Sequence, residues 1–154
     1  MRMNVNQSTK SSISFIDANI LGYAYERSNL QKHNIAAHLL RPCWQTKTKF
    51  ALSTQILGEF FTLITKKVKK SLDTRIAQII ITDIIDLPYW KVLSYNEKTV
   101  IMALDIASNF GMPYWDSLIA ATMTEHDIST IYTENIKDFK VPWIKAISPF
   151  KIRL

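Results

Sequence analysis

The sequence predicts an α/β fold in which a short, mostly parallel central sheet is covered by helices on both faces. Short apolar segments alternate along the chain with longer segments of helical periodicity, as in a parallel sheet with crossover helices. Only 3 glycines and 5 prolines occur in 154 residues, which leaves little sequence for long irregular loops. With 47% apolar residues, the chain has enough side chains for one hydrophobic core.

The expected strands are short and mainly apolar, as strands covered on both faces of a sheet are. The first, SISFI at residues 12–16, follows a polar segment at residues 1–11 that we expect to be loose. The remainder, residues 12–154, is expected to fold as a single domain. The strands are predicted at residues 12–16, 50–52, 90–93, 130–132 and 144–147.

The expected helices are recognised by apolar residues at helical spacing and by their end signals. The segment that begins at Thr54 has the strongest apolar periodicity. The segment that begins at Glu97 ends at Gly111, and Pro113 follows as a stop signal. The helices are predicted at residues 20–25, 33–40, 54–68, 72–85, 97–110 and 115–126.

Charge and cysteine content limit the classes of function. The net charge of +6 attracts polyanions, of which nucleic acid is the natural candidate. The single cysteine, Cys43, excludes an internal disulfide and predicts a free thiol in a reducing compartment. The N-terminus lacks the apolar core of a secretory signal, and the most apolar stretch, Ile76–Leu87, is too short and too charged to span a bilayer. We therefore expect a cytoplasmic protein without a membrane segment.

Polar residues follow two of the predicted strands directly. Asp17 comes after the first strand, at the carboxyl end where parallel sheets bind ligands, and Asn19 lies in the same turn. Capping of the next helix is an equally good interpretation of these residues. The late strand ends in Tyr-Thr-Glu-Asn, so Glu134, Asn135 and Asp138 are further candidates, each also typical of an ordinary turn.

Two carboxylates lie on helix faces that are otherwise apolar. Glu59 shares its face with Ile56 and Phe60, so its side chain is expected to point toward the core. Burial of a lone charge costs several kcal/mol, which requires a basic partner, a cation or an edge position. Asp116 shares a similar face with Ile119, although it lies near the helix start and also suits a dipole interaction there.

Convergence of Asp17, Glu59 and Asp116 would require a counter-charge. Two like charges about 4 Å apart repel by roughly 4 kcal/mol at an effective dielectric constant near 20. Oxygen ligands favour Mg²⁺ or Mn²⁺, and the chain's single cysteine and three histidines show no zinc-ligand spacing. Such an ion suits phosphodiester hydrolysis, because it neutralises the phosphate and activates a water.

Four motifs carry a resemblance to a known family. They are FIDANILGYAY, STQILGEFFTLITKK, PYWDSLIAAT and IYTENIKDF, and the chain also ends in ISPF at residues 147–150. With these motifs in this order, the chain resembles PIN-domain nucleases, and most closely the VapC-type toxins of bacterial toxin–antitoxin pairs. The resemblance extends over residues 14–150. It implies a PIN fold, Mg²⁺- or Mn²⁺-dependent ribonuclease activity, a homodimer, and inhibition by a small cognate antitoxin.

The resemblance also assigns roles to residues. Asp17, Glu59 and Asp116 match the first three acids of the family, while Asn135 stands where a fourth acid is usual. An asparagine removes one negative charge, which lowers metal affinity unless Glu134 or Asp138 compensates. Two further residues are candidates for supporting this site. Thr133 matches a serine or threonine that the family has near its acids, and Asn19 lies in a turn that is part of the family pattern.

Basic and aromatic residues are candidates for RNA contact. The lysines at the end of the Glu59 helix suit a phosphate-contacting patch, although a solvated helix end is the simpler interpretation. They are Lys66, Lys67, Lys69 and Lys70. Trp115, beside Asp116, is able to stack on a base but is more typical of a core residue.

Two other functions compete with an active ribonuclease. Asn135 is compatible with a PIN-like module that has weak or no catalysis and only binds RNA or a protein partner. A phosphatase of the haloacid-dehalogenase type also begins with an aspartate after the first strand. That class needs a second aspartate where this chain has Asn19, so the sequence disfavours it.

Overall fold

The central sheet contains five parallel strands in the order β3-β2-β1-β4-β5. The computed structural model describes residues 13–151, so the segment 1–11 that we expected to be loose lies outside the described residues. The parallel sheet confirms the predicted α/β class. The strands are β1 (Ser14–Ile16), β2 (Phe50–Ser53), β3 (Trp90–Leu93), β4 (Thr130–Tyr132) and β5 (Lys145–Ile147).

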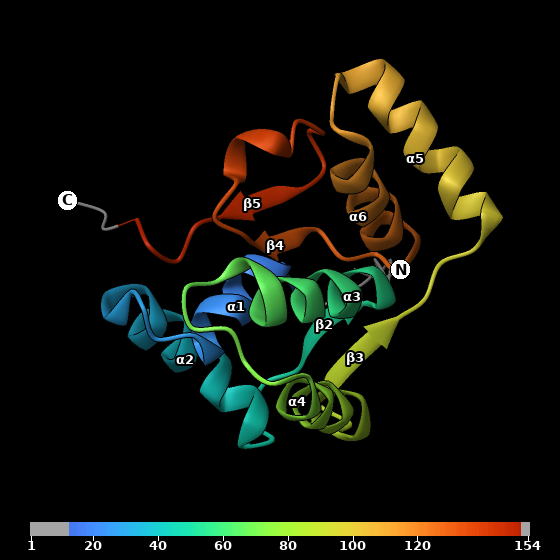
Figure 1. The fold of residues 1–154 in the computed structure, drawn as a ribbon. Helices are drawn as coiled ribbons and strands as arrows, with labels where there is room; N and C mark the ends of the chain where they lie inside the picture. Colours follow the sequence, from blue (N-terminus) through green and yellow to red (C-terminus); the bar gives the residue numbers. More distant parts are fainter. Residues whose placement is uncertain (1–12, 152–154) are drawn as a thin grey trace, which may run out of the picture.

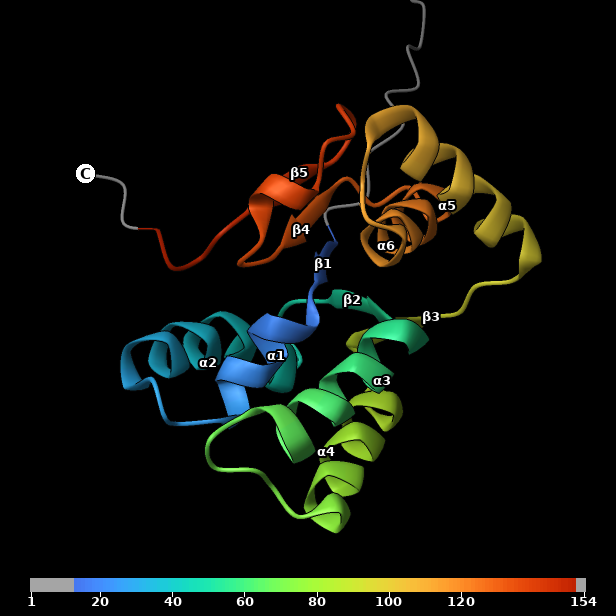
Figure 2. The ribbon, with the colours of Figure 1, turned by 45° about the horizontal axis from the view of Figure 1, so that its top comes forward.

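Helices cover both faces of the sheet, as predicted (Figures 1 and 2). The connections from β1 to β2 and from β2 to β3 run in one direction across the sheet, and right-handed crossovers place their helices on one face. The connection from β3 to β4 runs back and places its helices on the other face. The first group is α1 (Ala18–Tyr25), α2 (Leu30–Trp44), α3 (Thr54–Thr62) and α4 (Thr74–Asp86), and the second is α5 (Glu97–Phe110) and α6 (Tyr114–Glu125).

The strand order changes direction between β1 and β4. The chain adds β2 and β3 on one side of β1, and then adds β4 and β5 on its other side. In parallel sheets, ligands bind outside the carboxyl ends of the strands at such a switch point. Asp17 directly follows β1 and Thr133 directly follows β4, so both lie at this position.

The core lies between the sheet and its helices. Phe15, Leu52 and Ile131 of the strands are fully buried, and so are Ile56 and Phe60 of α3. Burial of side chains of this size contributes about 1.5–3 kcal/mol each. Within residues 13–151, none of the helices is long and apolar enough to cross a membrane.

Helix ends differ from the predictions where local signals were weak. The predicted end of the second helix at residue 40 was too early, because α2 continues to Trp44 and accommodates Pro42 in its last turn. Gly111 ends α5 in the left-handed conformation, with φ of 62°, as predicted. The 3₁₀ turn η2 (Ile136–Asp138) was not predicted.

The predicted helix at residues 54–68 is interrupted. After α3 the chain forms a π-helical turn, η1 (Leu63–Lys67), before it leaves the helix at Val68. A Cβ atom on Gly22 would lie 2.5 Å from Cδ2 of Leu63, so the glycine allows α1 to pack closely against this turn. The packing brings the first helix and the lysine-rich segment together.

Candidate functional site

Asp17 lies at the carboxyl end of β1 and is buried, with 7% of its surface exposed. Its Oδ1 atom accepts a hydrogen bond from the backbone N–H of Ala18 at 2.7 Å, which caps α1 as the alternative interpretation predicted. Its Oδ2 atom accepts a bond from the Thr133 hydroxyl at 2.7 Å. Burial raises the pKa of Asp17, and the two hydrogen bonds partly offset that rise.

Glu59 lies on α3 beside the fully buried Ile56 and Phe60, but its own side chain is exposed. The expectation that it points toward the core was wrong, because it stands at the edge of the apolar face and borders a cleft. Gln55 Nε2 donates to Glu59 Oε1 at 2.9 Å and to the carbonyl of Trp115 at 3.0 Å. Gln55 therefore holds the Glu59 carboxylate beside the start of α6.

Asp116 lies in the first turn of α6 and is half-buried. Within residues 13–151, its carboxylate forms no ion pair and accepts no hydrogen bond. Burial is the first cause that raises the pKa of Asp116 to about 6, and repulsion by Asp138, Asp17 and Glu59 adds to the rise. These carboxylates are therefore close enough to act on one another electrostatically.

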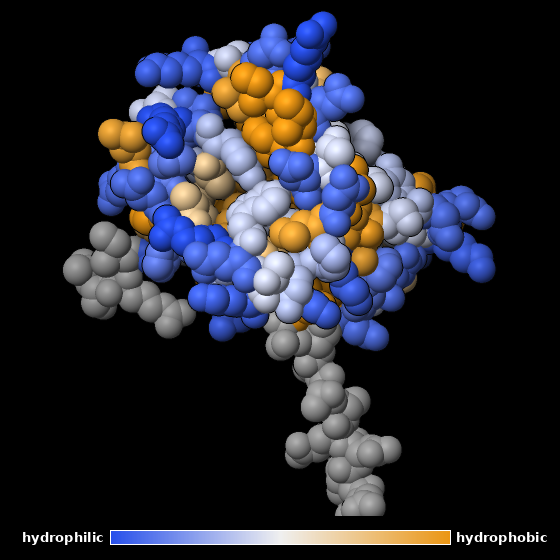
Figure 3. All heavy atoms as spheres, turned by 90° about the horizontal axis from the view of Figure 1, so that it is seen from below, coloured by the Kyte–Doolittle hydropathy of each residue, from blue (hydrophilic) through white to orange (hydrophobic). Residues whose placement is uncertain are grey.

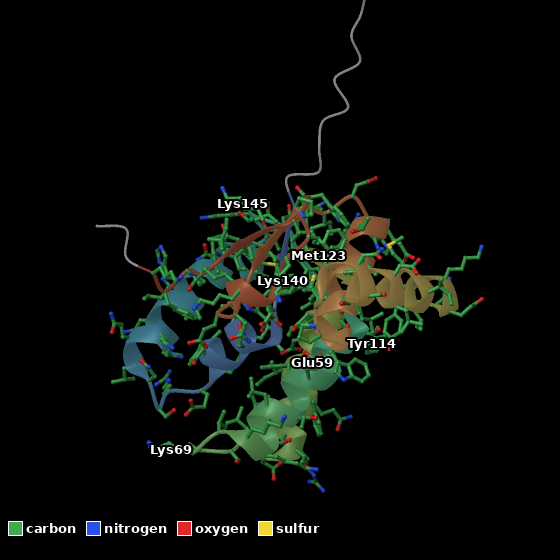
Figure 4. The ribbon with its side chains drawn as sticks, turned by 90° about the horizontal axis from the view of Figure 1, so that it is seen from above. Glu59, Lys69, Tyr114, Met123, Lys140 and Lys145 are labelled. Carbon is green, nitrogen blue, oxygen red and sulfur yellow. The ribbon has the colours of Figure 1, made fainter. Side chains whose placement is uncertain are left out.

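The three predicted acids line one open cleft of about 690 Å³. Asn19 and Asn135 line the same cleft, so segments far apart in the sequence meet there. Figure 4 shows Glu59 of α3 next to the start of α6, where Tyr114 lies. On one side of the cleft, Asp17 is buried at the end of β1. On another side, the hydrogen bonds of Gln55 link Glu59 of α3 to Trp115 of α6.

A comparison with family models identifies this architecture. The model of the PIN domain matches residues 14–141. The chain belongs to the PIN domain family. Among curated protein sequences, none matches this PIN domain.

Several solved structures share the fold of this PIN domain. A toxin–antitoxin complex from Klebsiella pneumoniae has 17% sequence identity and a TM-score of 0.63, covering 90% of this chain and 99% of that chain. The VapC20 toxin of Mycobacterium tuberculosis, which cleaves the sarcin-ricin loop, has 17% identity and a TM-score of 0.60, covering 77% and 87%. VapBC2 from Rickettsia felis, bound to a promoter DNA fragment, has 21% identity and a TM-score of 0.60, covering 88% and 97%. At this level of identity, the likeness establishes the fold.

None of the three acids of this PIN domain forms an ion pair within residues 13–151, although the charge of Lys67 lowers the pKa of Glu59. Within residues 13–151, the one ion pair joins Lys32 to Glu134, and neither residue lines the cleft. In the same part of the chain, no three His, Cys, Asp or Glu side chains converge closely enough to hold an ion by themselves. An open set of oxygen donors fits Mg²⁺ or Mn²⁺, because Mg²⁺ keeps several waters and takes only one or two carboxylates directly.

The fourth acidic position contains an exposed asparagine. Asn135 lines the cleft, and its backbone N–H donates to the hydroxyl of Thr133 at 3.1 Å. Neither Glu134 nor Asp138 lines the cleft, and Glu134 is held by Lys32. Asp138 raises the pKa of both Asp17 and Asp116, so its charge reaches the site. Of the two predicted substitutes for the missing acid, the structure favours Asp138.

The lysine-rich segment divides into residues near the cleft and residues away from it. Lys67 lines the cleft, Lys69 lines a neighbouring cavity, and Lys66 and Lys70 line neither. Trp115 also lines the cleft with 60% of its surface exposed, so the expectation that it is a core residue was wrong. Exposure of an aromatic ring beside Asp116 suits stacking on a base.

Several residues that line the cleft were not predicted from the sequence, among them Gln55 and Tyr95. Gln55 precedes Glu59 by four positions, which is the helical spacing for side chains that meet, so this signal was available. Tyr95 lines the cleft from the connection after β3 with 39% of its surface exposed, and no local pattern marks it.

Cys43 is fully buried on α2, and burial raises the pKa of its thiol to about 11. A thiol in this environment stays protonated at neutral pH and is a poor nucleophile. The structure therefore agrees with the predicted free, unreactive cysteine.

The raised pKa of Asp116 predicts an unusual dependence of stability on pH. Between its ordinary value of 3.8 and about 6, the folded protein binds a proton that the unfolded chain has released. The contribution of this group to stability therefore decreases as the pH rises through this range and is constant above it. In a chelating buffer, lowering the pH from about 7.5 to about 5 is expected to stabilise the wild type relative to Asp116→Asn. Thermal unfolding of both proteins measures the difference, and a difference independent of pH would contradict the assignment.

Proposed function

We propose that this PIN domain is a Mg²⁺- or Mn²⁺-dependent endoribonuclease that hydrolyses RNA phosphodiester bonds. The observation that carries the proposal is that Asp17, Glu59 and Asp116 line one cleft, where burial raises the pKa of each and the charges of Asp17 and Glu59 raise that of Asp116 further. The chain as a whole carries a net charge of +6, which attracts a polyanion to this acidic cleft. Bound in the cleft, the ion supplies a counter-charge for the phosphate and an activated water.

The residues of the chain have distinct roles in this proposal. Asp17, Glu59 and Asp116 would hold the ion, one or two of them directly and the others through bound waters, with Asn135 as a neutral oxygen donor. Thr133 and Ala18 fix the orientation of Asp17, and Gln55 fixes that of Glu59. These hydrogen bonds arrange the donors before substrate binds, which reduces the reorganisation needed in the transition state.

Metal removal tests the activity directly. The wild type is expected to cleave a pool of total RNA in Mg²⁺ or Mn²⁺, and the cleavage should stop when EDTA is added. Excess Mn²⁺ added after EDTA should restore cleavage, because the core of the protein is built from its own apolar side chains. Gel electrophoresis with sequencing of the product ends measures the reaction. Cleavage that persists in EDTA would contradict metal dependence.

Asn135 supports a second candidate, a PIN module with weakened catalysis that binds RNA or a protein partner. The missing carboxylate lowers the negative charge of the cleft and with it the affinity for a divalent ion. The two candidates differ in one measurement: RNA that binds the wild type without being cleaved in either ion would favour the binding module.

We further propose that the protein is the toxin of a toxin–antitoxin pair, acts on RNA in the cytoplasm, and binds a small cognate antitoxin. One of the similar structures is described as a toxin–antitoxin complex, and another, VapC20, as a toxin that cleaves the sarcin-ricin loop. An apolar area on the lower face, where α4 lies, suits a protein partner or a homodimer (Figure 3). The exposed apolar residues of α4 are Ile76, Ile79 and Ile85.

A further inference from the structure

A second pocket adjoins the acidic cleft. Its volume is about 570 Å³, and it lies between α1, the connection from α1 to α2, the segment after η1, and residues 134–135. Asn19, Leu63, Lys67 and Asn135 line both this second pocket and the cleft, so the two spaces meet there. Both volumes fall within the range of about 300–1,000 Å³ that is typical of small-molecule sites. The cleft and the second pocket therefore have room for neighbouring units of one extended ligand.

In the second pocket the two carboxylates have partners, whereas two of the lysines form no ion pair within residues 13–151. Glu26 is buried and accepts hydrogen bonds from the backbone N–H of Ser28 at 2.8 Å and from its hydroxyl at 2.5 Å. Glu134 is paired with Lys32. Lys67 and Lys69 form no ion pair within residues 13–151, and the charge of Lys67 also acts on Glu59 of the cleft. The side chains left to attract a ligand are therefore the two lysines, which favour an anion.

The polar groups of the second pocket include hydrogen-bond donors. The Oδ1 atom of Asn19 accepts the backbone N–H of Glu134 at 3.3 Å, and the Oδ1 atom of Asn29 accepts that of Lys32 at 3.1 Å. Within residues 13–151, each asparagine thus uses its oxygen in the fold, and its amide nitrogen makes no hydrogen bond and stays available as a donor. Donors beside two cations match the acceptor-rich phosphate and sugar of a nucleotide.

We propose that the second pocket binds the nucleotide next to the one cleaved, with its phosphate between Lys67 and Lys69. This inference rests on the proposed ribonuclease function and adds to it the path that the RNA strand follows across the protein. The RNA strand passes from the cleft, where Trp115 lies, across Lys67 and into the second pocket. Lys69 lies at the far end of this path, in the segment after η1 and away from Tyr114 (Figure 4). Lys69 is therefore a binding residue whose charge contacts RNA without taking part in the reaction.

Salt-dependent binding of RNA tests the second pocket. The probe is a fluorescent single-stranded RNA of ten nucleotides, bound to the Asp116→Asn protein in Mg²⁺ so that cleavage does not interfere. Adding Lys69→Gln is expected to weaken binding about tenfold, as loss of a hydrogen bond to a charged group does. The slope of log K against log salt should decrease by about 0.7, the value for one lost phosphate contact on a single strand. Lys47→Gln, which removes an exposed lysine away from both spaces, is the matched control for net charge.

A chemically modified RNA locates the contact. Replacing one phosphodiester at a time with an uncharged methylphosphonate should weaken binding at a linkage next to the cleavage site. At that linkage, the replacement should have no further effect once Lys69→Gln is present, because the two changes remove the same contact. Equal affinities and slopes for Lys69→Gln and Lys47→Gln would overturn the proposal. So would a loss of affinity for a polyglutamate peptide without any loss for RNA, since that result assigns the pocket to a protein partner.

The outcomes separate this proposal from the proposed function. If the wild type cleaves RNA but Lys69→Gln behaves as Lys47→Gln does, the second pocket is wrongly assigned and the ribonuclease proposal stands. If the wild type neither binds nor cleaves RNA, both proposals are overturned. If RNA binds through Lys69 but is not cleaved, the second pocket remains an RNA-binding site, and both the catalytic proposal and the position next to a cleaved nucleotide are overturned.

Discussion

Replacing Asp116 with asparagine is expected to lower metal-dependent RNA cleavage at least about 100-fold while the protein stays folded. Loss of a residue that only orients a metal ligand costs about 10–100-fold, so loss of a ligand itself should cost more. The change should not destabilise the protein, because Asp116 has no hydrogen-bonding partner within residues 13–151 and is repelled by the neighbouring carboxylates. Initial cleavage rates in Mn²⁺ and thermal unfolding in chelator measure the two effects.

Asp105→Asn is the matched control for this substitution. Asp105 is exposed on α5 and does not line the cleft, so the same chemical change should leave the rate unchanged. A residual rate for Asp116→Asn within a few-fold of the wild type would place the catalytic centre elsewhere. A loss of rate accompanied by unfolding would show instead that Asp116 has a structural role.

Replacing Asp138 with asparagine is expected to lower cleavage about tenfold to 100-fold, the range for residues that support a metal site indirectly. With Asn135 neutral, Asp138 supplies the remaining negative charge that reaches Asp17 and Asp116. Cleavage rates measured over a series of Mn²⁺ concentrations should show that more ion is needed for half-maximal activity.

A second substitution makes the test of Asp138 specific. Adding Asn135→Asp to Asp138→Asn should restore much of the lost affinity for Mn²⁺, because it returns a carboxylate to the cleft at a neighbouring position. If Asp138→Asn has no effect on rate or on Mn²⁺ dependence, the site works with three acids. If Asn135→Asp fails to restore activity, charge alone does not explain the role of Asp138.

The sequence was sufficient for the elements whose boundaries have local chemical causes. The end of α5 follows from the left-handed conformation that Gly111 adopts easily, and the short apolar strands β3 and β4 have the predicted limits. The end of α2 was missed because a proline in the last helical turn is less disruptive than one in the middle. The π-turn η1 packs closely against Gly22 of α1, a contact between distant segments that no local pattern reveals.

The site was predictable only in part, and for a physical reason. The positions of Asp17 and Thr133 after strands predicted a shared edge of the sheet, but their direct hydrogen bond depends on the pairing of β1 with β4. Helical spacing predicted that Glu59 lies on the apolar face of its helix. It was not precise enough to show whether the residue stands at the centre of that face or at its edge. Residue type suggested that Trp115 was buried, whereas its exposure is decided by a cleft that forms between distant segments.

The π-turn also determines in which direction around the helix axis Lys67 points relative to Glu59. In a regular α-helix of 3.6 residues per turn, a residue eight positions further on lies about 80° around the axis. A π-turn takes more residues per turn, which rotates the following side chain back toward the starting face and places Lys67 at the mouth of the acidic cleft. A chain one residue shorter in this segment would keep every acid and every lysine but direct the ammonium group elsewhere. Gain or loss of a single residue in this segment would thus move the ammonium group of Lys67 relative to Glu59 without altering any of the acids.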